Sequence, residues 1–562
     1  MLAYHDATKH HPHGYAKGPG RLDWATQPDP FRRYEGAAVV SLLLGGDEPE
    51  PLYDEILSPG AVSPRPLNRR SISAFFECSL GLTAWKSYRG TSWSLRCNPS
   101  SGNLHPTEGY LLAGPIEGIS ATPAVYHYAP REHALERRHE IGPTVWQRLM
   151  QGLGDSAFLV GLTSIYWREA WKYGERAFRY CQHDAGHALA CLRFAAAMSG
   201  WRLRVIEESG DADIGRLLGV DREGDYSDAE RENPDLTAVV TPTDRPLPAT
   251  LTLDTDAIDA VAGGAWFGRA NPLSGGHVSW DLIDEASEAT EKPRGLPMAM
   301  AWQPRKDRRS EVASAHMEGE SHGGGPTARQ IVLQRRSGTD YDGETAITAP
   351  RFYGMLQRLM PIAAASGRPV PWDAISWPPT VHLFLFVHRV ADLPSGIYGL
   401  ARDALKVEEL RAATRKEFAW QPVKNSPAGL PFFMLMQTDC RHAAARLSLG
   451  QEIAADGAFS LAMIAEFERP LREYGPWFYR RLFWEAGMVG QVLYMEAEAL
   501  GARCRANIRG TGMGAYFDDW VHETLGLEGH AFQDLYHFTV GGAVDDDRLT
   551  TLPPYDAAAT RT

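Results

Sequence analysis

The chain has 562 residues, of which 44% are hydrophobic and 10% aromatic, and this is enough apolar material for large cores in about two to four domains. Its formal net charge of −13 argues against broad binding to nucleic acids or anionic membranes, because both need an excess of Lys and Arg. The cysteines are scattered without a CxxC pair, and no apolar core of a signal peptide is visible near residue 1, so we expect a cytoplasmic protein that binds a small molecule or a peptide.

Residues 1–60 are rich in His, Pro, Gly and aromatic residues, and we interpret them as an N-terminal arm. The segment His10–His13 suggests a metal site, but no Cys or carboxylate cluster completes a coordination shell. His183 and His187, four residues apart on a predicted helix, could also face a metal, although core packing is the better interpretation. We therefore predict no metal site.

A small polar loop, Pro-Ser-Ser-Gly-Asn-Leu-His-Pro, runs into the apolar segment Tyr110–Ala113. Prolines fix its ends, a glycine lets the backbone approach a ligand closely, and two hydroxyls and an amide offer hydrogen bonds to a planar polar ligand. An ordinary turn at the start of a strand is the alternative. The predicted binding residues of this loop are Pro99, Ser100, Ser101, Gly102 and Asn103.

Helices and strands of ordinary length are predicted around this loop. A helix begins in Ser71–Leu80, Tyr126–Pro130 and Phe158–Thr163 are short strands, and Arg179–Met198 has the periodicity and length of a longer helix. We expect Gly200 to end that longer helix.

Residues 251–327 contain few periodic apolar positions and a Gly-rich run at 321–326. We interpret them as a long linker over the surface. The linker separates a first domain at 61–250 from a second domain at 328–562.

The second domain repeats the first. Lys172–Gly174 matches Glu473–Gly475, and Asp184–Gly186 matches Glu485–Gly487, each pair being 301 residues apart. The Arg-Arg-Ser segment at 69–71 recurs at 335–337. Two copies at so long a period predict a tandem domain duplication, which can pack about a pseudo-twofold axis as an intramolecular pseudo-dimer.

The two copies differ where their motifs lie. The loop at 99–103 has Pro371–Ile375 as its counterpart, which lacks the hydroxyls and the amide. Conversely, Arg509–Gly514 carries glycines where the first copy has Val205–Gly210. Each half keeps what the other lacks, and random decay would have no reason to spare one complete set.

In combination these motifs resemble the nitroreductase superfamily of flavoproteins and, more narrowly, its SagB/ThcOx-type dehydrogenases. The resemblance rests on the Arg-Arg-Ser segments, the polar loop, Lys172–Arg176 and the run that begins at Arg509, and it covers most of residues 65–220 and 328–555. It implies an α+β fold of two sandwich domains, each a mixed central sheet flanked by helices, with FMN held between two such units.

In that family the Arg-x-Ser segment and a glycine loop of one unit hold the phosphate side of FMN, and the polar loop of the other unit lines the isoalloxazine. Forked arginine donors and backbone amides ahead of a helix suit a phosphate chemically. Ser73 and Thr339 stand where the family has a basic residue, which is a departure from its pattern. Besides the polar loop, the resemblance assigns cofactor binding to Arg335, Arg336, Ser337, Gly510, Gly512 and Gly514.

Lys172 and Tyr173 are the predicted catalytic pair. In the azoline-oxidising members of the family a Lys-Tyr pair handles the proton, and only the first copy keeps the lysine here, since Glu473 replaces it in the second. A lysine beside a flavin can accept a proton while hydride leaves for the flavin. An exposed lysine next to a packing tyrosine is the alternative.

We therefore predict an FMN-dependent oxidoreductase with one composite flavin site per chain. It would act as a dehydrogenase or oxidase on a peptide-derived or small-molecule substrate, with hydride transfer to flavin N5 and O2 or NAD(P)H as electron partner. Two alternatives stay open from the residues alone: an NAD(P)H-dependent nitro or quinone reductase, and a flavin-free pseudoenzyme that acts as a binding scaffold.

Overall fold

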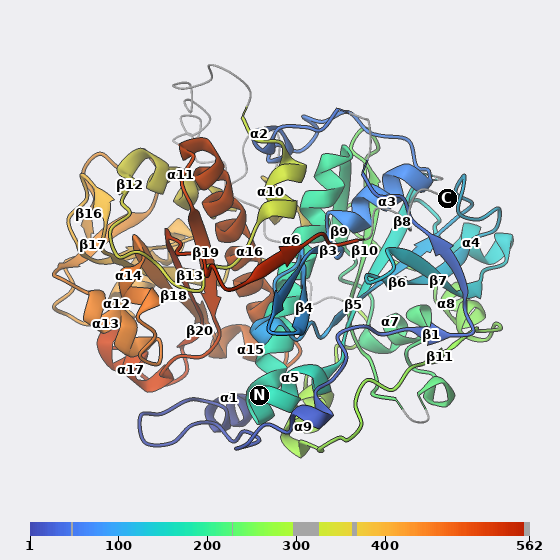
Figure 1. Ribbon diagram of the computed structural model, residues 1–562, viewed down its shortest axis with the longest axis horizontal. Coiled ribbons are helices and arrows are strands. Elements are labelled where there is room, and N and C mark those ends of the chain that lie inside the picture. The colour runs from blue at the N-terminus through green and yellow to red at the C-terminus, as the bar shows by residue number, and fades with distance from the viewer. Residues whose placement is uncertain (46–48, 155, 227–228, 296–324, 362–367, 556–562) are drawn as a thin grey trace. The chain divides into compact units, whose positions relative to one another are not determined.

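The computed structural model describes residues 1–45, 49–154, 156–226, 229–295, 325–361 and 368–555 (Figure 1). These residues divide into two compact units. Unit 1 takes in residues 1–17, the described part of 302–369, and 377–547. Unit 2 takes in the described residues of 18–301, together with 370–376 and the described part of 548–562.

Unit 2 is built on a sheet that has, in its described residues, seven strands in the order β2-β7-β6-β5-β8-β10-β9. Neighbouring strands are antiparallel. Its central strands β5 and β8 are buried along their whole length, as their apolar sequences require. The strands are β2 (Ala38–Ser41), β5 (Thr107–Ala113), β6 (Ala124–Ala129), β7 (Ala134–Glu140), β8 (Phe158–Ser164), β9 (Trp201–Val205) and β10 (Asn233–Pro242).

Helix α6 is the buried centre of unit 2. Every residue of it is buried, and small Ala and Gly side chains allow it to pack closely against β5, β8 and β9. It ends before Gly200, whose φ of +66° suits glycine, and this confirms the predicted stop. The helices are α2 (Tyr53–Ile56), α3 (Arg69–Glu77), α4 (Pro143–Leu149), α5 (Tyr166–Tyr173), α6 (Ala177–Met198), α7 (Asp211–Leu218), α8 (Thr255–Ala262) and α9 (Asp281–Ala289).

Two small sheets complete unit 2. The short strands β1 and β11 pair with each other, and β3 pairs with β4 on one side and β21 on the other. Strand β21 comes from the C-terminal part of the chain, and the Tyr555 hydroxyl near it accepts from the Leu82 amide at 2.8 Å. These strands are β1 (Tyr34–Glu35), β3 (Leu82–Tyr88), β4 (Thr91–Arg96), β11 (Arg269–Ala270) and β21 (Thr550–Leu552).

Unit 1 is built on a second antiparallel sheet, with seven strands among the described residues in the order β16-β17-β15-β13-β18-β20-β19. Figure 1 shows its strands in orange to red. The strands are β13 (Val381–Val387), β15 (Gly396–Leu400), β16 (Gln421–Pro422), β17 (Phe432–Gln437), β18 (Phe459–Glu466), β19 (Ile508–Met513) and β20 (Phe532–Gly542), and β12 (Ile347–Thr348) pairs separately with β14 (Val390–Ala391).

The long helix α16 packs against β19 and β20 and is buried along almost its whole length. A membrane-spanning helix needs about 20 consecutive apolar residues. Over the ranges that the structure describes, no helix is both long and apolar enough for that. The helices of unit 1 are α1 (Leu2–Ala7), α10 (Ala328–Gln334), α11 (Ala349–Arg358), α12 (Val407–Ala413), α13 (Arg441–Leu447), α14 (Ile453–Asp456), α15 (Glu468–Tyr474), α16 (Phe478–Cys504) and α17 (Asp518–Leu525).

The α+β fold class is confirmed, and the two large sheets share one plan. In unit 2, β5 lies beside β8, and β10 and β9 follow towards one edge. In unit 1, β13 lies beside β18, and β20 and β19 follow towards the corresponding edge. The expected mixed sheet is wrong, since both sheets are antiparallel. Short connections such as the one between β6 and β7 join neighbouring strands as hairpins, and a hairpin makes its strands antiparallel.

The two Arg-Arg-Ser segments do not occupy equivalent places, which corrects the match made from sequence. Arg69 is the first residue of α3, and the Asn68 side chain caps that helix by accepting from the Ser71 amide at 3.0 Å. Arg335 instead directly follows α10. Helix α11, not α10, precedes the central strand β13 as α3 precedes β5. The identical tripeptides therefore mark a helix start in unit 2 and a helix end in unit 1.

The predicted linker at 251–327 contains regular structure where it is described. Helix α8 buries Ala257, Ile258 and Val261 in the core of unit 2, and α9 follows it. We missed these helices because each is short and turns only two or three apolar side chains inward. Residues 321–324 of the Gly-rich run at 321–326 lie outside the described residues.

The N-terminal arm is divided between the units. Residues 1–17 belong to unit 1, where the His10 amide donates to the Asp518 carboxylate at 2.9 Å and the His11 ring contacts Asp519. The rest of the arm belongs to unit 2 and supplies β1 and β2. Across the part of the chain that the structure describes, no three His, Cys, Asp or Glu side chains are grouped to hold a metal ion.

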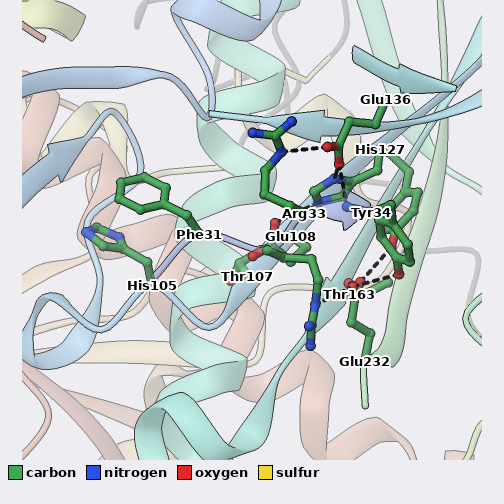
Figure 2. A network of polar contacts seen from close by, with 12 residues as sticks. Phe31, Arg33, Tyr34, His105, Thr107, Glu108, His127, Glu136, Thr163 and Glu232 are labelled. Carbon is green, nitrogen blue, oxygen red and sulfur yellow. Dashed lines mark hydrogen bonds and ion pairs between the residues drawn. The ribbon is translucent and has the colours of Figure 1, made fainter. Parts of the chain in front are cut away.

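A buried ion network joins the central strands of unit 2 to α5 (Figure 2). His127 on β6 lies 3.0 Å from Glu108 on β5 and 2.9 Å from Glu136 on β7, and Arg168 on α5 pairs with Glu108. Burial alone would lower the pKa of His127, but its bonds to the two carboxylates outweigh burial and raise the pKa to about 9. The network fixes the helix that carries the predicted catalytic pair.

Candidate functional site

The candidate site in unit 2 lies where the end of α5 meets the polar loop. Gly174, with φ +55°, ends α5 directly after Tyr173. A Cβ added to Gly102 of the loop would lie 2.6 Å from the Tyr173 hydroxyl and 3.0 Å from Lys172 Nζ. Gly102 has a φ of +59° and no room for a side chain, so glycine is required there on two grounds. The structure thus brings together three residues that were singled out from the sequence.

The side chain of Asn103 is held within its own loop. Its amide nitrogen donates to the Ser94 carbonyl at 2.9 Å, and its amide oxygen lies 3.0 Å from His105 Nε2. The amide that was expected to contact a planar ligand thus makes hydrogen bonds to Ser94 and His105 in this structure. His105 is buried, and burial lowers its pKa well below the ordinary value, so its ring is neutral.

Two buried carboxylates lie behind the loop, and sequence reasoning gave them no role. Asp184 on α6 accepts from the Ser101 amide at 3.1 Å and from the Ser101 hydroxyl at 3.3 Å. Glu169 on α5 lies 3.4 Å from the Ser100 hydroxyl and is fully buried. Among the described residues its second oxygen, Oε2, has no hydrogen-bond partner.

The two acids affect the protonation of their surroundings. Burial raises the pKa of Asp184 to about 7, and burial with the charge of Asp184 raises the pKa of Glu169 well above its ordinary value. Burial and the charge of Glu169 also raise the pKa of Tyr173 well above the usual value for a phenol. Tyr173 therefore keeps its proton and can donate a hydrogen bond.

One signal in the sequence could have pointed to Glu169. It stands three residues before Lys172 on α5, so both side chains lie on one face of the helix. The positions 301 residues later are Pro470 and Glu473, so the second copy lacks both members of the pair.

The predicted counterpart of the loop, Pro371–Ile375, also belongs to unit 2. There Asp373 forms a two-pronged ion pair with Arg193 of α6, at 2.8 and 2.7 Å. Trp372 is fully buried. In this part of the chain the segment acts as a packing element of unit 2.

In unit 1 the second group of predicted residues surrounds Tyr494 of α16. The Arg335 guanidinium lies 5.0 Å from the centre of the Tyr494 ring, and the Ser337 hydroxyl lies 3.0 Å from the Tyr494 hydroxyl. Arg336 donates to the carbonyls of Leu333 and Arg335 at 2.9 and 2.7 Å. The three residues are therefore ordered around the end of α10.

The glycines that follow Arg509 do not form the expected anion nest. Gly510 and Gly512 lie in strand β19, and the Gly512 amide donates to the Tyr494 hydroxyl at 2.9 Å. Side chains there would collide with Phe538 and Tyr536 of β20. The family resemblance implied a loop here, whereas pairing with β20 keeps the glycines extended. Gly514 directly follows the strand.

Three arginines gather near Glu498 in the Arg335 region, and one of them, Arg509, also pairs with Asp545 at 3.0 Å. Burial raises the pKa of Glu498, while the positive charges of Arg509, Arg335 and Arg336 lower it. Three guanidinium groups thus act on one carboxyl. An anion with several oxygens, such as a phosphate, fits such a donor set chemically.

Comparison with known proteins defines the fold. No protein-family model matches the chain. A Methanocaldococcus jannaschii protein that is provisionally named a nitroreductase is 24% identical over 161 residues, which are 28% of this chain and 76% of that protein.

A solved structure from Anabaena variabilis, also provisionally named a nitroreductase, is 21% identical and aligns over 97% of this chain and 99% of its own with a TM-score of 0.66. A structure from Exiguobacterium sibiricum, described as being in complex with FMN, is 13% identical over 38% of this chain and 87% of its own, with a TM-score of 0.22. The chain therefore has the fold of the Anabaena variabilis structure along almost its entire length.

Proposed function

We propose that the chain is an FMN-dependent oxidoreductase that acts as a dehydrogenase or oxidase on a peptide-derived or small-molecule substrate. The observation that carries the proposal is the convergence of Lys172 Nζ and the Tyr173 hydroxyl on Gly102 of the polar loop. The site offers an amine, a neutral phenol and backbone without a side chain at one point. Such a set suits a flat cofactor that lies beside a substrate, where the substrate must lose a proton.

The roles of the pair follow from their surroundings. Lys172 is the amine of the pair and lies in the last turn of α5, directly before Tyr173. Tyr173 stays a phenol and can donate a hydrogen bond to an oxygen or nitrogen of the substrate. We infer that Lys172 takes a proton from the substrate and that Tyr173 orients the substrate.

When bound, FMN would supply the two-electron acceptor for the hydride that leaves the substrate. The residues that we propose to hold its phosphate are Arg335, Arg336 and Ser337, and the gathering of guanidinium groups near Glu498 supports this. Gly510 and Gly512 would let the backbone of strand β19 approach the flavin closely. The Gly512 amide and the Gly510 carbonyl already take part in hydrogen bonds within unit 1.

The resemblance stated from sequence also implies a tandem duplication and a single flavin shared by the two sets of motifs. The common strand order of the two sheets supports the duplication. The ratio of one FMN per chain stays a prediction. Quantifying released flavin against protein tests it, and a ratio near two would contradict it.

The first experiment is the colour of the purified protein. We expect a yellow protein that releases FMN on denaturation. A colourless protein that ignores added FMN would favour the scaffold alternative. Anaerobic addition of NAD(P)H separates the remaining alternatives: rapid bleaching without another substrate favours the nitro or quinone reductase, and unchanged colour favours the dehydrogenase.

A further inference from the structure

The hydroxyl of Ser100 lies between a buried acid and the backbone of its own loop. It lies 3.4 Å from Glu169 Oε1 and 3.5 Å from the Ser101 carbonyl oxygen. A serine hydroxyl has one proton to donate and two acceptor positions. The His105 amide fills one acceptor position at 2.8 Å. The Ser100 hydroxyl can therefore donate to the Ser101 carbonyl and accept a hydrogen bond from Glu169.

The surroundings of the two acids decide which one carries the proton. Asp184 accepts from the amide and the hydroxyl of Ser101, and both bonds stabilise a carboxylate. Glu169 is fully buried, meets only the long contact with Ser100, and keeps Oε2 without a partner in the described part of the chain. An ionised Glu169 would thus be a buried charge with few donors, which is costly.

We propose that Glu169 is a proton-holding positioning residue: as a neutral acid it donates to the Ser100 hydroxyl, while the neighbouring Ser101 donates to the Asp184 carboxylate. The chain of bonds runs from α5 through the polar loop to α6. It fixes the loop that faces Lys172 and Tyr173. The inference rests on the proposed function for its role in catalysis, but the proton itself is a property of this chain alone.

Other titratable groups near the pair come from three elements. Lys172 and Tyr173 lie on α5, and Cys181 on α6 responds to both acids. Asp235 on β10 acts on Cys181 and accepts from Ser164 at 2.6 Å. Lys172 is the cation that acts on Glu169, so two ionised acids here would leave unbalanced negative charge in a buried site.

A neutral Glu169 has a consequence for its neighbour. Lys172 stands one turn further along the same face of α5, and an ionised Glu169 would hold it as an ion pair. A proton on Glu169 removes that partner and leaves the lysine available to the substrate. The second copy has Pro470 and Glu473 at these positions and cannot build the same arrangement.

Infrared spectroscopy of the full-length protein tests the proposal without flavin or substrate. A protonated carboxylic acid has a carbonyl stretch that a carboxylate lacks. Spectra would be recorded at a pH of about 8, above the pKa of about 7 of Asp184, for wild type, Glu169→Gln, Asp184→Asn and the exposed control Glu473→Gln. We expect the wild-type minus Glu169→Gln difference to contain one acid band. The Asp184→Asn and Glu473→Gln differences should lack it.

Each other outcome overturns the proposal. An acid band in the Asp184→Asn difference alone would put the proton on Asp184. No acid band in either difference would mean that both acids are ionised. Circular dichroism and thermal unfolding check that the variants fold, and Glu169→Asp supplies a second variant, which should keep the band at a shifted frequency.

A second readout links the proton to turnover. If the proposed function holds, Glu169→Gln should keep FMN and keep most of the rate of flavin reduction at neutral pH, because glutamine is neutral and can donate to Ser100. Glu169→Ala should lower that rate at least tenfold. A colourless protein would end the proposed function but leave the infrared result in force, so the two failures are distinguishable.

Discussion

The two long buried helices carry a carboxylate at the same position, and the two carboxylates have different neighbours. Asp184 on α6 and Glu485 on α16 are 301 residues apart, and each accepts backbone amides of the turn that leads into the first central strand. The Ser101 amide donates to Asp184 at 3.1 Å, and the amides of Thr380 and Val381 donate to Glu485 at 2.9 and 3.3 Å. Anchoring this turn is the shared structural task.

The difference lies in what balances the charge. In unit 1 the buried Arg402 guanidinium pairs with Glu485, and the anchor is closed by an ion pair. In unit 2 the neighbour of Asp184 is another acid, Glu169, and burial raises the pKa values of both. The carboxylate at this position forms a buried ion pair in unit 1. In unit 2 its counterpart, Asp184, has a pKa of about 7 and lies near Lys172 in the candidate site. Perturbed carboxyls of this kind mark functional sites more often than structural ones.

The largest effect is expected for Lys172→Ala. Removing the proton acceptor should lower turnover by about two to four decades, while FMN stays bound, because the side chain is not among the proposed phosphate ligands. Flavin content and the rate of flavin reduction by substrate measure the two quantities. Glu473→Ala, at the matching position of the second copy, is the control and should change neither. An equal loss in both variants would remove the distinction between the halves.

The ion pair of unit 1 predicts a large effect on stability. Arg402→Ala would leave Glu485 as a buried charge without its cation, which costs about 3–5 kcal/mol in free energy of unfolding. Near pH 5, where Asp184 carries its proton, Asp184→Asn should cost less, about 1 kcal/mol, since asparagine keeps an oxygen for the Ser101 amide. Urea unfolding followed by circular dichroism compares their midpoints. A larger loss in Asp184→Asn would reverse our assignment of the structural and the titratable anchor.

The proposed phosphate ligand Arg335 predicts an effect on FMN affinity and none on the rate of the bound flavin. Arg335→Ala should weaken FMN binding by about one to two decades, the value of a charge-assisted hydrogen bond of about 1.5–3 kcal/mol. Arg69→Ala is the control from the other Arg-Arg-Ser segment, and its guanidinium contacts the Ser41 carbonyl on the surface. Titration of apoprotein with FMN gives both affinities. Weaker binding in Arg69→Ala with normal binding in Arg335→Ala would move the phosphate to the other segment.

Much of the fold and part of the site could be predicted from the sequence. Periodicity and length predicted the helix that the structure shows as α6, and Gly102 with its polar neighbours predicted a loop there. The contact of that loop with Lys172 comes from the structure. The pairing of Glu169 with Asp184 could not be predicted, since they lie on different helices and meet only when α5, α6 and the loop pack together.

Local patterns also misled in specific places. Two identical Arg-Arg-Ser tripeptides suggested equivalent positions. The segment at 69–71 begins helix α3, which Asn68 caps, whereas the segment at 335–337 follows the end of α10. The family resemblance implied a loop at Gly510 and Gly512, and only the register with β20 keeps them in a strand. Long-range pairing overrides local propensity in both the strand and the helix boundaries.

The last prediction is a pH dependence of stability that sets the two anchors apart. Asp184 has a pKa of about 7 in the folded protein against an ordinary 3.8, so between these values the folded state binds a proton that the unfolded state has released. By linkage the free energy of unfolding then falls as pH rises through this window. Glu169, whose pKa burial also raises, adds to the decline in wild type and variants alike, and His127 adds to it only between about 6.5 and 9. Asp184→Asn should flatten the decline in the urea midpoint between pH 4 and 7 relative to wild type, whereas Glu473→Gln should keep the wild-type slope; an unchanged slope in Asp184→Asn would mean that this carboxyl is ionised throughout the range.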